Sequence, residues 1–191
     1  MSTKFGLIVA ATPKGEIGFK NTIPWRLKGD LKRFKDLTQG NAIIYGRNTL
    51  ESFPGGKPLP NRMNIILSST LQLKDVQTPE LNVAIARDMV GAIEIAQLID
   101  KPWSYFVGGA GVYDAALDFV DKAHVTIVHG REDTEYDTRI TNFNFPVGVW
   151  ESRQHETILE WPDYNLFPVP SHTYLEYSRI PPIAEMDVFN R

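Results

Sequence analysis

The sequence predicts an α/β fold: a single domain on a mostly parallel central β-sheet, with an antiparallel C-terminal edge strand and about four flanking helices. The first indication is the run 5–11, which is almost wholly apolar, as expected for a strand covered on both faces. The second is the alternation of strand-like and helix-like segments as far as residue 119. The third is the change after Ala123, where strand-like segments follow one another with no helix between them.

Eight short segments rich in apolar residues, most of them bounded by turn residues, are predicted as strands. They are residues 5–11, 42–45, 63–67, 81–86, 104–107, 124–129, 149–158 and 172–178. Residues 28–37 are predicted as a helix because large apolar side chains from Leu27 to Leu37 recur on one face. Residues 89–98 and 112–119 are also expected to be helical, and another helix is expected to start after residue 46.

Residues 12–24 contain several prolines and glycines and form a loop that is long for a compact domain. Loops of this length are often functional. A second loop is expected at 54–58. No linker divides the chain, so residues 1–179 are expected to form one domain and residues 180–191 a C-terminal extension outside the sheet.

Composition excludes several classes of function. The chain of 191 residues has a net charge of −3 and no cysteine. Disulfides, thiolate metal sites and a cysteine nucleophile are therefore excluded, and no basic surface for nucleic acid or acidic lipid is indicated. The first apolar run is too short to span a membrane and lacks the features of a signal peptide, so we expect a cytoplasmic protein.

Asp30 is the first candidate functional residue, early in the predicted helix and after the long loop. One interpretation is an acidic first-turn residue that stabilises the helix dipole. The other is a carboxylate in an apolar cleft, where desolvation would raise its pKa and let it bind an amidine-like edge of a heterocycle. Spacing alone leaves both open.

Two strand-to-helix turns are candidate phosphate sites. Gly108–Gly109–Ala110–Gly111 could present backbone N–H groups at a helix start, although it matches neither the Rossmann fingerprint nor a phosphate loop. In Gly46–Arg47–Asn48–Thr49, the arginine could pair with a phosphate. Ordinary structural turns, with a solvated arginine in the second case, are the alternatives.

Ser68 and Ser69 end another strand and offer hydroxyl donors, and Arg62 follows a turn with a guanidinium suited to a carboxylate ligand. An ordinary turn and a surface arginine are the alternatives. No histidine and carboxylate cluster has metal spacing, so no metal is expected. Nothing around the serines suggests a hydrolase triad.

Together and in this order, these stretches resemble dihydrofolate reductases of bacterial or phage type over residues 5–179. The matching stretches are Val9–Ala10–Ala11, Ile17–Gly18 through Asn21 to Pro24–Trp25, Asp30–Leu31 with Phe34, Gly46–Arg47–x–Thr49, Leu59–Pro60–x–Arg62–x–Asn64, Leu67–Ser68–Ser69 and Val107–Gly108–Gly109 through Tyr113. Thr126, Asp137–Thr138, Phe145–Pro146 and Ser171–His172–x–Tyr174 follow in the same order. The Pro-Trp-x-Leu-x-x-Asp segment is the most specific.

The resemblance implies reduction of 7,8-dihydrofolate to tetrahydrofolate with NADPH, in support of thymidylate and one-carbon metabolism, and binding of antifolates. It makes Asp30, Thr126 and Trp25 the catalytic residues. It places the substrate against Val9, Ala10, Ile23, Asp30, Leu31, Phe34, Phe53, Leu59, Arg62, Val107 and Thr126. Arg62 would bind the glutamate α-carboxylate of folate. A monomer is expected.

The same resemblance places NADPH against residues from four regions of the chain. They are Ala11, Ile17, Gly18, Asn21, Gly46, Arg47, Asn48, Thr49, Leu67, Ser68, Ser69, Val107, Gly108, Gly109, Ala110, Gly111, Val112 and Tyr113. Arg47 and Ser69 would contact the 2′-phosphate. Asp30 would grip the ring edge opposite the nitrogen that gains a proton, so a water admitted past the loop 18–23 is the expected proton carrier.

The chain departs from the family pattern in a few places. Gly111 stands where many members have an arginine, Asn48 where a histidine is common, and Lys57 in place of an arginine. The segment 133–145 is longer than usual. A reductase of the same fold acting on a ribosylated pyrimidine is the nearest rival, and a non-catalytic binding or structural protein is a second. The context of Asp30 favours folate.

Overall fold

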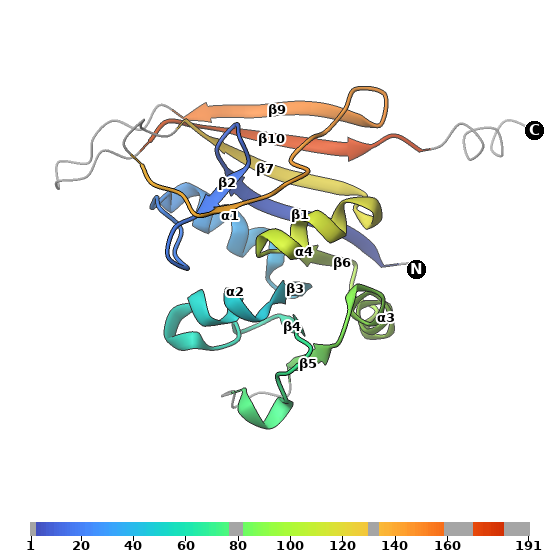
Figure 1. The fold of residues 1–191 in the computed structure, drawn as a ribbon. Helices are drawn as coiled ribbons and strands as arrows, with labels where there is room; N and C mark the ends of the chain where they lie inside the picture. The colour runs from blue at the N-terminus through green and yellow to red at the C-terminus, as the bar shows by residue number, and fades with distance from the viewer. Residues whose placement is uncertain (1–2, 77–81, 130–133, 159–169, 182–191) are drawn as a thin grey trace, which may run out of the picture.

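The computed structural model describes residues 3–76, 82–129, 134–158 and 170–181. Its main feature is an eight-stranded sheet in the order β5-β4-β3-β6-β1-β7-β10-β9, with β2 and β8 forming a separate pair (Figure 1). The strands are β1 Lys4–Ala11, β2 Glu16–Gly18, β3 Ala42–Gly46, β4 Met63–Leu67, β5 Val83–Ala86, β6 Trp103–Phe106, β7 Lys122–Val128, β8 Thr138–Arg139, β9 Trp150–Ile158 and β10 His172–Arg179.

The sheet is parallel from β5 to β7 and antiparallel where β10 and β9 join it. The central strand β1 pairs with β6 on one side and with β7 on the other, so that Leu7 lies between Phe106 and Ala123. Both faces of β1 are covered, which explains its unbroken apolar sequence. The predicted fold class is confirmed.

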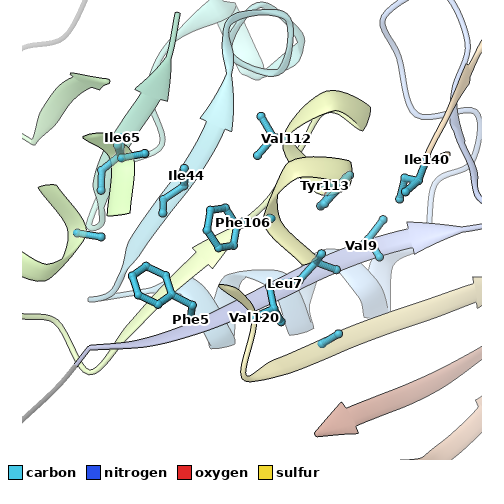
Figure 2. Close-up of a cluster of buried hydrophobic side chains, with 14 of the residues drawn as sticks. Phe5, Leu7, Val9, Ile44, Ile65, Phe106, Val112, Tyr113, Val120 and Ile140 are labelled. Carbon is cyan, nitrogen blue, oxygen red and sulfur yellow. The ribbon is translucent and has the colours of Figure 1, made fainter. Parts of the chain in front are cut away.

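Four α-helices cover the two faces of the sheet within the described ranges: α1 Lys28–Thr38, α2 Arg47–Ser52, α3 Met89–Ile99 and α4 Ala110–Ala116. On one face, α3 and α4 pack over every second residue of β1. Together with neighbouring strands they form the large hydrophobic cluster that Figure 2 shows. On the other face, α1 and α2 pack over Ile8, Ile43 and Tyr45. The alternation of β1 side chains between the two clusters is the period of two expected of a strand.

Helix boundaries have local causes. The Asp88 carboxylate caps α3 by accepting from the Gly91 N–H at 2.8 Å, and Asp100 ends the helix in the left-handed conformation. Helix α4 begins two residues before the predicted 112–119 segment and gives way to a 3₁₀ turn, η3, at Leu117–Phe119. Two further 3₁₀ turns are η1 at Pro54–Gly56 and η2 at Leu73–Asp75.

Three expectations need correction or refinement. The predicted loop 12–24 contains β2, which pairs with β8 from the long segment after residue 134. The last strand, β10, is not the edge, because β9 lies outside it. Of the extension 180–191 only two residues lie within the described ranges, and the Ile180 N–H donates to the Val149 carbonyl. None of the described helices has the length and hydropathy to span a membrane.

Candidate active site

Asp30 and Thr126 meet in the structure although 96 residues separate them. Asp30 lies in the first turn of α1 and Thr126 in the middle of β7, where it is 2% exposed. The threonine hydroxyl donates to Asp30 Oδ1 at 2.5 Å. Burial raises the pKa of Asp30, against the opposing effects of the Thr126 hydrogen bond and of nearby His172 and Arg33. The carboxylate is therefore a desolvated group with one neutral donor, which supports the second of the two interpretations.

The loop before α1 is held against the segment that follows residue 134. The Asp137 N–H donates to the Gly18 carbonyl at 3.0 Å, and the Asp137 carboxylate accepts from the Lys20 N–H at 2.7 Å. This backbone donor lowers the pKa of Asp137. The structure thus places Ile17, Gly18 and the exposed Asn21 in a loop fixed at its base.

Trp25 follows that loop. Its ring packs at an angle on Tyr136, with 5.9 Å between ring centroids. Its indole Nε1 is buried and has no partner among the described residues. An indole N–H can only donate, so this atom is free to donate to a ligand or water.

The carboxyl end of β1 lies beside Thr126, because Ala10 and Thr126 are partners in the parallel register. Val9, Ala11 and Val107 are buried here. The Tyr113 hydroxyl crosses from α4 and donates to the Ile8 carbonyl at 2.8 Å. Tyr113 therefore ties α4 to β1.

The predicted apolar substrate residues differ in exposure. Ile23 and Leu31 are 62% and 53% exposed. Phe34, Phe53 and Leu59 pack against the α1 and α2 side of the core. The predicted substrate residues thus include both exposed residues and residues packed on the core.

Arg62 lies beside Phe34, with its guanidinium 5.8 Å from the ring centroid. Its Nε donates to the Pro60 carbonyl and its Nη1 to the Thr38 hydroxyl, both at 3.1 Å. Burial lowers the pKa of this guanidinium, which still stays charged at physiological pH. Two of its donors are thus used to fix its position.

The two strand-to-helix turns lie side by side. The Gly46 N–H donates to the Gly108 carbonyl at 2.9 Å. A Cβ at Gly108 would lie 3.2 Å from the Thr49 hydroxyl, and the φ of Gly108 is +124°, which favours glycine. No side chain caps Gly109 at the start of α4. A larger residue at Gly108 would therefore be strained and would crowd Thr49, so glycine is required at this point of the two turns. A Cβ at Gly111 would meet nothing within 4 Å.

Arg47 is less available to bind a phosphate than its sequence context suggests, because its Nε pairs with the Glu51 carboxylate at 2.8 Å on the surface of α2. The Ser68 hydroxyl accepts from the Leu71 N–H, whereas Ser69 is exposed, as is Thr70 after it. Arg87, which was not predicted as a site residue, lies at the same turn. Its Nη1 donates to the Ser68 and Leu71 carbonyls, at 2.8 Å each.

The signal that could have identified Arg87 was its position directly after a parallel strand, like Arg47 and Ser68. Arg33 was not predicted as a site residue, and His172 was predicted only as part of a matching stretch with no role, although both oppose the rise in the pKa of Asp30.

A cavity of about 560 Å³ lies elsewhere, between the C-terminal end of α4 and the start of β9, and is lined in part by Asp118, Trp150 and Arg179. None of the predicted site residues lines it. Across the described part of the chain, no group of three or more His, Cys, Asp or Glu side chains is placed to hold a metal.

A mostly parallel sheet with two adjoining strand-to-helix turns, and a half-buried carboxylate bonded to a strand of that sheet, is typical of α/β enzymes that bind nucleotides. Comparison with known proteins identifies the family. Residues 4–165 match the family model described as dihydrofolate reductase. The chain belongs to the dihydrofolate reductase family, and its prediction as an NADPH-dependent oxidoreductase of that family is confirmed.

The relatives include dihydrofolate reductase type 9 of Escherichia coli, 35% identical over 136 residues, which are 69% of this chain and 75% of that protein. Dihydrofolate reductase of Mycobacterium leprae is 36% identical over 129 residues, or 66% of this chain and 73% of that protein. A solved structure of the Enterococcus faecalis enzyme, complexed with NADP(H) and RAB-propyl, matches with a TM-score of 0.72 and 27% identity. That match covers 95% of this chain and all of the other.

Proposed function

We propose that this chain reduces 7,8-dihydrofolate to 5,6,7,8-tetrahydrofolate with NADPH, and that Asp30, Thr126 and Trp25 are its catalytic residues. The observation that carries the assignment is the hydrogen bond between the half-buried Asp30 and the buried Thr126. An ionised carboxylate in an apolar cleft is complementary to an amino group beside a protonated ring nitrogen, and two parallel hydrogen bonds would fix the ring's orientation. The 2-amino group and adjacent nitrogen of a pterin provide that edge.

The protein then orients the ring and controls access of water. NADPH supplies the hydride when bound. Asp30 holds the ring edge opposite the imine nitrogen that gains a proton, so it stabilises charge on the ring and does not donate directly. The buried Trp25 Nε1, which has no hydrogen-bond partner among the residues that the structure describes, is suited to hold a water admitted past the loop 18–23. Alignment of two rings and exclusion of bulk water are the main contributions of the fold.

Arg62 would bind the glutamate α-carboxylate of folate. Pro60 and Thr38 fix its Nε and Nη1. Its Nη2 makes none of these bonds and is the group we assign to the ligand. Antifolates that carry a glutamate would use the same contact, and Lys57 is the next candidate cation near the turn.

Gly108, Gly109 and Thr49 would hold the cofactor pyrophosphate at the start of α4, and Arg47 and Ser69 would contact the 2′-phosphate. Gly111 supplies no charge there. Arg87, held beside Ser69 by two backbone carbonyls, would provide the second cation in its place. The monomeric state and the cytoplasmic location remain predictions.

The test is the decay of NADPH absorbance with and without dihydrofolate, and then with an antifolate. Decay that depends on dihydrofolate and stops with the antifolate supports the proposal. Decay only with a ribosylated pyrimidine would favour the rival reductase, and binding of ligands without turnover would favour the non-catalytic alternative.

A further inference from the structure

A layer of polar side chains lies directly behind the Asp30 and Thr126 pair, between α1 and β10. Tyr174 on β10 is the antiparallel register partner of Thr126 on β7. His172 lies two residues earlier on the same strand and therefore on the same face of the sheet, opposite Val128. The strand thus places both side chains next to the residue that bonds Asp30.

Tyr174 contacts α1 at the residue before Asp30. A Cβ on Gly29 would lie 3.0 Å from the Tyr174 hydroxyl, so the hydroxyl lies against the helix backbone and excludes a larger residue. Arg33, one turn after Gly29, places its guanidinium 4.8 Å from the centroid of the Tyr174 ring. This is the geometry of a cation–π contact.

His172 is completely buried, and both of its ring nitrogens have polar neighbours. Nδ1 lies 3.2 Å from the Pro170 carbonyl and Nε2 lies 3.1 Å from the Tyr174 hydroxyl. A carbonyl can only accept, so Nδ1 carries a hydrogen and donates it. Nε2 and the Tyr174 hydroxyl share a hydrogen bond in which the ring accepts when it is neutral and donates when it is charged, and this bond fixes the position of the hydroxyl in both cases.

The charged and titratable groups near Asp30 lie on α1, β10 and α4. Arg33 lies on α1, and His172 and Tyr174 lie on β10. Both Arg33 and His172 oppose the rise in the pKa of Asp30 that burial causes. From α4 the carboxylate faces Tyr113, and burial followed by the charge of Asp30 raises the pKa of that phenol.

Arg33 is itself held from β7. Its Nη2 lies 3.4 Å from His124 Nδ1, and an arginine can only donate. The pKa of His124 is lowered to about 4, mainly by burial, so the ring is neutral and accepts this bond at neutral pH. The charge of Arg33 is thus fixed in place beside Asp30 without a competing cation at His124.

We propose that His172, Tyr174 and Arg33 are positioning residues for the reduction, which hold Asp30 and Thr126 in register and keep the Asp30 carboxylate ionised when the pterin edge binds. The inference rests on the proposed function for its catalytic meaning. A purely structural layer would fill the same space but would not affect the protonation of Asp30.

The test compares Arg33→Met, His172→Gln and Tyr174→Phe with the control Lys32→Met. Lys32 is the neighbouring cation on α1, and its ammonium pairs with Asp36 in solvent. Titration of ¹³C-labelled aspartate carboxyls by NMR, with the Asp30 signal assigned through Asp30→Asn, reports protonation without turnover. We expect the pKa of Asp30 to rise by about half a unit or more in Arg33→Met and His172→Gln. Tyr174→Phe should raise it less, and Lys32→Met should leave it unchanged.

Turnover supplies a second readout. The pH profile of kcat/KM for dihydrofolate should shift in the same direction as the NMR value in each variant. Variants that lose thermal stability but keep the pKa of Asp30 at its Lys32→Met value would overturn the proposal. If the chain fails to reduce dihydrofolate, the titration still decides whether the layer controls Asp30, so failure of the function and failure of the inference remain distinguishable.

Discussion

Replacing Thr126 by valine removes the hydroxyl that donates to Asp30 and nearly preserves the shape of the side chain. The threonine is 2% exposed and its hydroxyl lies 2.5 Å from Asp30 Oδ1. A hydrogen bond to a charged group contributes about 1.5–3 kcal/mol, whereas one between neutral groups contributes about 0.5–1.5 kcal/mol. Thr126→Val should therefore lower the free energy of unfolding by ~2 kcal/mol where Asp30 is ionised and by ~1 kcal/mol where it is protonated.

The dependence on pH follows from linkage. Burial raises the pKa of Asp30 above its ordinary value, and loss of the Thr126 donor raises it further. A carboxyl group with a raised pKa destabilises the folded state as the pH rises through that pKa. The difference in the free energy of unfolding between the wild type and Thr126→Val should therefore begin to grow at the pKa that Asp30 has in the wild type. It should become constant above the higher pKa that Asp30 has in the variant.

Urea denaturation at several pH values between about 4 and 8 measures this deficit. Thr22→Val is the matched control, because the Thr22 hydroxyl donates to the neutral Phe19 carbonyl at 2.8 Å. Its deficit should not change with pH. A deficit of Thr126→Val that is equally independent of pH would refute the reasoning, since it would mean that Asp30 stays in one protonation state throughout.

Three other variants test the site. Asp30→Asn should fold and bind NADPH but lose most turnover at neutral pH; wild-type turnover at pH 7 would show that the carboxylate is not needed. Because Gly111 adds no charge and we assign the second cation to Arg87, Arg87→Gln should relax the preference for NADPH over NADH by roughly tenfold through loss of a charge-assisted contact. Equal efficiency of the wild type with both cofactors would contradict the roles of Arg47 and Arg87. Arg62→Leu should weaken methotrexate, which has a glutamate, by a few kcal/mol and leave trimethoprim unchanged. Equal losses for the two inhibitors would make Arg62 a structural residue.

Much of the fold could be predicted because its strands are marked by local patterns. The predicted strand over 63–67 agrees with β4 residue for residue, and β1 differs by one residue. The short strands β2 and β8 were missed because three and two residues leave no periodicity. Their pairing depends on contacts such as the Ile140 N–H with the Gly15 carbonyl, which join segments far apart in sequence.

The site was predictable only in part, for a different reason. Asp30 and Gly108 stand in stretches that resemble the family, and the resemblance assigns them a role where spacing alone left alternatives open. Arg33 lies outside those stretches, and His172 stands in one to which no role was assigned. Their interest comes from their effect on Asp30, and that effect depends on how α1 packs against β10, which neither local sequence encodes. Residues that act through another residue are therefore the ones that sequence reasoning misses.

The strand order explains why the site lies where it does. β1 and β6 are adjacent and parallel, and the chain leaves them toward α1 on one face and α4 on the other. A crevice forms outside the carboxyl ends of parallel strands where successive connections leave toward opposite faces. Asp30 lies at the start of α1 and Gly109 at the start of α4, so each lies on one of these two connections. The sequence predicted the start of α1 and placed the start of α4 two residues late. It did not predict the order of the strands, and it is this order that makes β1 and β6 neighbours.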